Sequence, residues 1–314
     1  MILVEYFIIA LRKNFVFVIL LFTSYELHSQ CACMGGAPVG ALTPVGGTTN
    51  IGILKEGNLR AISFYSFSNG NEYNNKDSQT DQGLVQSFNS SYVGLLIGYG
   101  ILESLTIDTE LGYYLYKVQD FGFYNLSGSG FSHVTVYGKY NTYNSRAKEF
   151  EWTIGIGGRI PLNFDEVNLP QNIQSSTGAY GGILLSYLHK GFKSEGLHFI
   201  LVNRAEFNAK NKTTYKYGSS FVNSFFITKN MIGKLTGILE IRSDVRLRDS
   251  KYGNNIYDSG WNIIILSPQL NYSIGNFNFA AFFDFPVYKH YNGKQLTNKY
   301  SLGLAITWQT NLFK

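Results

Sequence analysis

Apolar and polar residues alternate along most of this chain, and this alternation constrains the fold more than any other feature of the sequence. From residue 57 onward, segments of about 10 to 15 residues alternate in this way, with turn-rich stretches between them. A β-strand has this period, because its successive side chains point to opposite faces. After residue 29 the sequence lacks the run of about 18 apolar residues that a membrane-spanning helix needs. The pattern therefore predicts an all-β protein.

The composition indicates that the outer surface of this protein meets something other than water. Only 15% of the residues are charged, whereas about a quarter are charged in an ordinary soluble domain. A β-barrel in a membrane explains both facts, because alternate residues face lipid and lumen. The net charge is +5, but the lysines and arginines are scattered and form no nucleic-acid-binding motif, so we expect no nucleic-acid partner.

We predict a transmembrane antiparallel up-and-down β-barrel of about twelve strands. The connections support this fold, because those after odd-numbered strands are long and those after even-numbered strands are short, with both termini at the periplasmic end. The long connections are expected at 69–89, 118–129, 162–176, 209–214, 249–258 and 289–297. The strands are expected at 57–68, 90–101, 103–116, 130–142, 149–161, 177–189, 196–208, 215–228, 234–248, 259–274, 276–288 and 298–313.

Three regions are expected along the chain. Residues 1–29 resemble a secretory signal peptide, with Arg12 and Lys13 before an apolar core. Residues 30–56 are rich in Gly and Pro and form either a periplasmic extension or a plug, and residues 57–314 form the barrel. The aromatic Phe313 next to the C-terminus resembles the signal that the barrel assembly machinery reads. We therefore expect an exported protein of the outer membrane, with its lipid as a partner.

The late segments Ser267–Tyr272, Phe285–Tyr288 and Asn292–Leu296 carry a Pro-aromatic step followed by an Asn-Gly-x-Gln loop. In these segments, and in Gly130–Tyr140, the chain resembles outer-membrane proteins grouped as MetA-pathway phenol-degradation transporters. The resemblance implies a barrel that passes small, often hydrophobic, compounds. The alternative is a structural or surface-binding barrel that does not conduct.

Charged residues recur on one face of several predicted strands. Because a charge on the lipid face costs roughly 2–4 kcal/mol at mid-membrane, these residues are expected to line the lumen. They form either a charged constriction that selects solutes or a salt-bridge network that fills a small barrel. Tyr113, Trp152, Trp261, Tyr288 and Trp308 are expected in the aromatic girdles of the outer surface. The expected lumen-lining residues are Asp108, Glu110, Arg204, Glu206, Glu240, Arg242, Asp244, Arg246, Arg248 and Asp284.

The cluster Cys31, Cys33 and Met34 is the most unusual local feature. Two thiolates and a thioether favour a soft ion such as Cu(I), although an oxidising compartment also favours a disulfide. The few histidines form no legible Ser-His-Asp pattern, so we do not expect an enzyme.

If the cluster binds copper, the mature protein should take up about one equivalent of Cu(I), as ligand softness predicts. The Cys31→Ser, Cys33→Ser variant should lose that uptake, measured by equilibrium dialysis against a Cu(I) chelator. Equal uptake by both proteins would leave the cysteines without a metal role.

Overall fold

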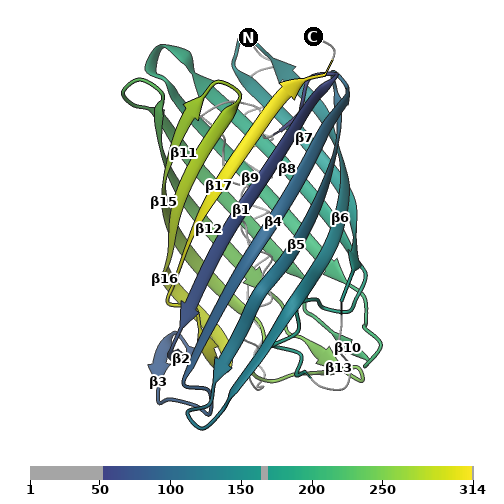
Figure 1. Ribbon diagram of the computed structural model, residues 1–314, viewed down its shortest axis with the longest axis vertical. Coiled ribbons are helices and arrows are strands. Elements are labelled where there is room, and N and C mark those ends of the chain that lie inside the picture. The colour runs from purple at the N-terminus through teal and green to yellow at the C-terminus, as the bar shows by residue number, and fades with distance from the viewer. Residues whose placement is uncertain (1–51, 164–168, 313–314) are drawn as a thin grey trace, which may run out of the picture.

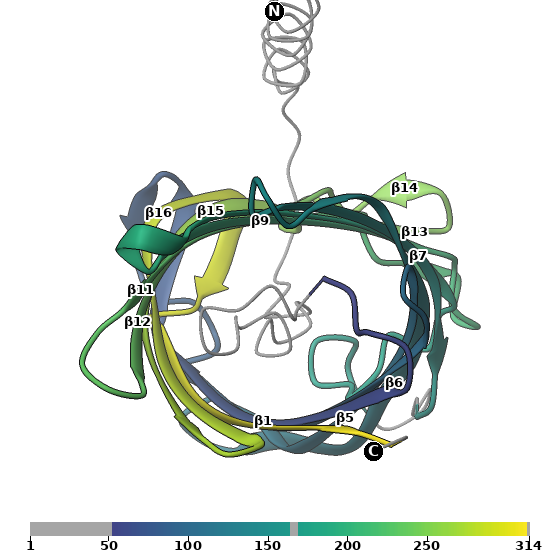
Figure 2. The same ribbon diagram turned by 90° about the horizontal axis from the view of Figure 1, so that it is seen from above.

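The computed structural model describes residues 52–163 and 169–312, and nearly all of its regular structure is β (Figure 1). Twelve long antiparallel strands form one sheet, in which each strand pairs with its neighbours in sequence. The first strand, β1, also pairs with the last, β17, so the sheet closes into a barrel (Figure 2). This confirms the predicted fold. The barrel strands are β1 (Asn58–Gly70), β4 (Ser87–Leu102), β5 (Leu105–Asp120), β6 (Asn125–Ser145), β7 (Phe150–Pro161), β8 (Gly181–Phe192), β9 (Leu197–Asn208), β11 (Ser220–Asn230), β12 (Leu235–Arg246), β15 (Trp261–Ile274), β16 (Phe277–Thr297) and β17 (Tyr300–Asn311).

Five short strands decorate one end of the barrel. β2 (Glu72–Lys76) and β3 (Ser78–Thr80) extend the far end of β16, where Thr297 pairs with Glu72. A separate three-stranded sheet consists of β10 (Tyr215–Lys216), β13 (Ser250–Lys251) and β14 (Asn254–Asn255). The connections at this end are therefore more ordered than the sequence suggests.

Three of the predicted boundaries differ most from the structure. Residues 289–297, predicted as a loop, continue β16, because their backbone pairs first with β15 and then with β2. The predicted loop at 118–129 shrinks to 121–124, since β5 and β6 extend their ladder into it. The strand expected at 215–228 begins only at Ser220, because Tyr215 and Lys216 belong to the small sheet.

The two ends of the barrel differ, as predicted. β1 starts and β17 finishes at the same end, which also holds the tight turns such as those at 103–104 and 275–276 (Figure 1). The opposite end carries β2, β3 and the three-stranded sheet. A single-turn 3-10 helix, Lys193–Glu195, forms the turn between β8 and β9. In the described residues, no helix is long and apolar enough to cross a membrane.

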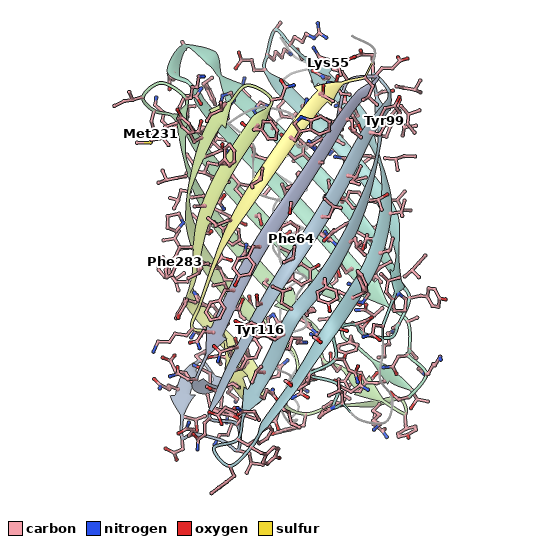
Figure 3. All side chains as sticks on the ribbon, in the orientation of Figure 1. Lys55, Phe64, Tyr99, Tyr116, Met231 and Phe283 are labelled. Atoms are coloured by element: carbon pink, nitrogen blue, oxygen red, sulfur yellow. The ribbon has the colours of Figure 1, made fainter. Side chains whose placement is uncertain are left out.

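The outer face of the barrel is apolar. Its exposed residues include Ile97, Ile156 and Leu304, which are 44%, 70% and 59% exposed. Figure 3 shows Phe283 and Met231 standing outside the wall. Trp152 and Tyr288 are also exposed, as predicted for a girdle, but Trp261 is only 6% exposed and faces inward, so that prediction is wrong. An apolar surface this extensive is unfavourable in water and suits contact with lipid.

The substitution Leu304→Arg tests whether lipid covers this face. In a bilayer it should lower the free energy of unfolding by about 2–4 kcal/mol, because it places a charge in hydrocarbon. Urea unfolding from phospholipid vesicles measures the effect, and Leu304→Ala controls for the lost side chain. Equal costs for the two variants would contradict a lipid-facing Leu304.

Candidate functional site

The most distinctive interior feature is a chain of ion pairs that crosses the lumen, which we call the central cluster: Glu110, Arg159, Arg204 and Glu206. Arg204 Nη1 lies 3.3 Å from Glu110 Oε2, and Arg204 Nε lies 2.7 Å from Glu206 Oε1. Arg159 Nη1 is 2.5 Å from the other oxygen of Glu206, and Arg159 also contacts Asn208. All four side chains are buried. Each charge therefore has an opposite charge within hydrogen-bonding distance, as a buried ion requires.

The central cluster joins parts of the wall that are not neighbours in the sheet. Glu110 lies on β5, whereas Arg204 and Glu206 lie on β9, four strands further around the barrel. Strand alternation places these side chains inward, because Leu111 and Phe207 beside them turn away. The ion pair between Glu110 and Arg204 is therefore a chord across the lumen rather than a contact along its wall.

A second group of charges lies toward the end of the barrel that holds the tight turns and both termini. Lys139 Nζ is 2.7 Å from Asp108 Oδ2, and Arg60 Nη2 is 3.8 Å from Asp108 Oδ1. All three side chains are about 2% exposed. Two cations surround the Asp108 carboxylate, and the buried carboxylate of Glu151 also acts on Lys139.

A third group joins β12 to β16 and holds more carboxylates than cations. Arg242 on β12 contacts Asp284 on β16 across β15, and its Nη1 lies 3.3 Å from Glu240 Oε1. Gln269 Nε2 donates a hydrogen bond of 2.9 Å to the second oxygen of Glu240. One cation therefore meets two carboxylates here. Asp244 accepts a hydrogen bond from the indole of Trp261 at 3.2 Å.

Arg246, at the end of β12, organises the connections on the decorated end. Its guanidinium lies over the rings of Tyr217 and Trp261, at 5.1 and 4.9 Å from the centroids, and its Nη2 is 2.7 Å from Asp249 Oδ1. Asp249 is fully buried and accepts hydrogen bonds from Tyr215 at 2.5 Å and from the backbone of Gly218 at 2.8 Å. Burial, and next the Asp249 carboxylate, raise the pKa of the Tyr215 hydroxyl well above its usual value, so it remains a donor.

The structure places most of the predicted luminal residues on inward faces and joins them into these clusters. Arg248 is the exception. The strand predicted at 234–248 ends at Arg246, so Arg248 lies in the connection that follows, near Asp258. Burial raises the pKa of the Asp258 carboxyl to about 6.

Sequence reasoning missed Arg60, Lys139 and Asp249. Lys139 could have been found, since it alternates with Val134, Val136 and Gly138 on β6. Arg60 could not, because it shares its face with apolar Ile62 and Phe64. Asp249 follows the end of its strand, where alternation no longer applies.

Apolar side chains also point into the lumen, on two opposite walls. One inner apolar patch gathers on β1, β4, β5, β6, β16 and β17, and the other on β8, β9, β11 and β12. The rings of Tyr92 and Tyr114 in the first patch meet edge to face at 4.8 Å. The patches consist of Ile62, Phe64, Tyr92, Leu96, Tyr114, Tyr137, Ala280 and Ala305, and of Tyr187, Ile200, Val202, Phe226 and Ile238.

The predicted metal cluster of Cys31, Cys33 and Met34 lies outside the described residues. Within residues 52–163 and 169–312, no group of three or more His, Cys, Asp or Glu side chains is placed to hold a metal ion. His189 and His198 lie 3.1 Å apart through their ring nitrogens. His133 bonds Ser132 at 2.7 Å and Thr177 at 3.0 Å, which holds the connection before β8 against β6.

Solved structures share this architecture. The COG4313 outer membrane channel from Pseudomonas putida F1 superposes with a TM-score of 0.71 at 10% identity, over 84% of this chain and 99% of that one. The KdgM porin reaches 0.45 at 9% identity, over 79% and 98%. At such identities the likeness shows the fold alone. No family model and no curated protein matches the sequence, so the resemblance to the phenol-degradation family stays a prediction.

The substitution Arg204→Gln tests whether the central cluster is a stabilising network. It leaves Glu110 without its cation, and the free energy of unfolding should fall by roughly 3 kcal/mol, as for other broken buried pairs. Arg146→Gln, at an exposed turn, is the matched control and should cost less than about 0.5 kcal/mol. Adding Glu110→Gln to Arg204→Gln should restore part of the loss in urea titrations. A single variant as stable as the control would mean that the pair contributes nothing.

Proposed function

We propose that this protein is an outer-membrane channel that passes small solutes with apolar or aromatic parts. The observation that carries the proposal is the combination of two inner apolar patches with ion-pair clusters in one lumen. A lumen lined only by charges would favour hydrated ions. Inward-facing rings such as those of Tyr92 and Tyr114, which are 5% and 8% exposed and pack against each other, would instead offer an entering solute aromatic surface and hydroxyl groups. The fold shared with an outer membrane channel supports the location.

The charges that line the described lumen nearly balance, with one more carboxylate than cations, and this bears on ion preference. The cations are Arg60, Lys117, Lys139, Arg159, Arg204, Arg242 and Arg246, and the carboxylates are Asp108, Glu110, Glu151, Glu206, Glu240, Asp244, Asp249 and Asp284. Taken alone, the arginine row of the strand predicted at 234–248, Arg242, Arg246 and Arg248 against Glu240 and Asp244, is locally positive and would favour anions. Because Glu240, Asp284 and Asp249 neutralise that row, we expect weak selectivity.

A closed barrel is the second candidate, and the chord between Glu110 and Arg204 favours it. Residues 52–56 also enter the lumen before β1 begins (Figure 2). There the backbone nitrogen of Leu54 donates a hydrogen bond of 2.8 Å to Thr106, and Leu54 is 1% exposed. Both features narrow the interior. If the lumen is too narrow to conduct, the barrel has a structural role or binds partners at its surface.

The remaining assignments complete the proposal. We propose that residues 1–29 direct export and are removed, and that residues 30–56 form a plug rather than an extension, since residues 52–56 already lie inside the wall. Membrane lipid and the barrel assembly machinery are the expected partners. We propose no catalytic reaction.

Planar-bilayer recording tests conduction and selectivity together. Wild type should conduct with little ion preference, and the Arg242→Ser, Arg246→Ser variant should become cation-selective, since Glu240, Asp284 and Asp249 lose their partners. A phenol-sized neutral solute should enter vesicles containing the protein faster than a sugar of similar mass.

Arg146→Ser combined with Lys148→Ser removes the same charge at an exposed turn and should leave selectivity unchanged. Absence of conductance in every form, including one that lacks residues 30–56, would favour the closed barrel over the channel.

A further inference from the structure

The small sheet of β10, β13 and β14 displays lysines without carboxylate partners. Lys210, Lys216 and Lys251 are all exposed, and Lys216 and Lys251 lie within its strands. Lys210 joins it through a bridge to Lys216. Tyr252, which follows Lys251, is 73% exposed. We call this surface the lysine shelf.

The position of the lysine shelf is unusual for a loop over a pore. It lies at the end of the barrel opposite the two termini (Figure 1). Viewed along the axis, β14 lies outside the ring of barrel strands rather than over the lumen (Figure 2). The shelf therefore projects sideways beyond the end of the apolar outer wall, where Phe207 near the end of β9 is 43% exposed.

The pairing within the shelf opposes like charges. Lys210 and Lys216 are bridge partners, so their Cα atoms lie only about 4.5–5.5 Å apart. Like charges directly opposite each other in a sheet are destabilising. The two acidic residues of the described connections 209–219 and 247–260 do not relieve this. Asp249 is fully buried and paired with Arg246. Asp258 is 6% exposed and accepts a hydrogen bond from the backbone nitrogen of Lys294. An anionic ligand would relieve the repulsion.

We propose that the lysine shelf binds the phosphorylated saccharide headgroups of lipids in the outer leaflet that surrounds the barrel. This proposal rests on the outer-membrane location given above, with the decorated end outside. Phosphate groups complement three ammonium groups that no described carboxylate neutralises. Asn254, Asn255 and Tyr252 are exposed beside the lysines and offer the amide and hydroxyl groups that hydrogen-bond sugars. If the acyl chains of such a lipid lie against the outer wall, its headgroup reaches the shelf from the side of the membrane.

The test compares two variants of equal charge. Lys210→Gln, Lys216→Gln, Lys251→Gln removes the shelf, and Lys148→Gln, Lys229→Gln, Lys234→Gln removes three exposed lysines from the opposite end. The full-length proteins are purified in an uncharged detergent, and binding of bisphosphorylated lipid A is measured by native mass spectrometry. Dephosphorylated lipid A and inorganic phosphate are the comparison probes. Circular dichroism and heat-modifiable gel migration show whether each variant is folded.

Wild type and the opposite-end variant should bind lipid A alike, and the shelf variant at least about tenfold more weakly, as surface lysines near anionic headgroups predict. Dephosphorylated lipid A should bind all three equally weakly. Equal losses in both variants would overturn the proposal, as would competition by millimolar phosphate, which indicates a soluble anion site. Conductance recorded on the same samples separates failure of the channel function from failure of the lipid-binding proposal. A barrel that does not conduct can still show the shelf-dependent difference in lipid A binding.

Discussion

The pairing of β1 with β17 is the interaction on which the rest of the structure depends. These strands come from opposite ends of the chain, yet they are in register from Asn58 opposite Asn311 to Asn69 opposite Tyr300. The pairing removes both edges of the sheet, so the ladder satisfies its backbone groups without water. Only a closed sheet can present an outer face as apolar as this one to lipid. Closure also fixes the interior, because inward side chains of distant strands must then share one lumen.

The lumen is where closure has its energetic consequences. A dozen strands enclose limited space, so inward charges lie close to one another and need partners. The chord from Glu110 to Arg204 and the contact from Arg242 to Asp284 satisfy that need between strands that are not adjacent. The inner apolar patches share strands with these pairs, since Tyr114 lies on β5 with Glu110 and Val202 lies on β9 with Arg204. The same interior therefore holds the barrel in shape and sets what a solute would meet.

Alternation within single strands was enough to predict the barrel and most of its luminal residues. It works on β12, where Glu240 and Arg242 alternate with exposed Leu239 and Ile241. It fails on β1, where Ile62 and Phe64 share the inward face with Arg60, since a lumen also buries apolar side chains. The residue type of Trp261 predicts a place in the outer girdle, but its ring lies inside the barrel against the Arg246 guanidinium. Alternation in the sequence shows which face of a strand a charged side chain occupies. Which opposite charge it meets depends on how far apart the two strands lie around the closed barrel.

That limit explains why the arginine row on β12 is misleading when it is read alone. Its positive charge is real along the strand, but Asp284 on β16 and Asp249 beyond the strand end oppose it. Since the lumen is close to neutral, the positive net charge of the chain must be displayed elsewhere. The lysine shelf is one such place, and it lies outside the wall. The charges inside this barrel thus largely neutralise one another. The lysine shelf has no described carboxylate partner, and it projects over the region where lipid headgroups would lie.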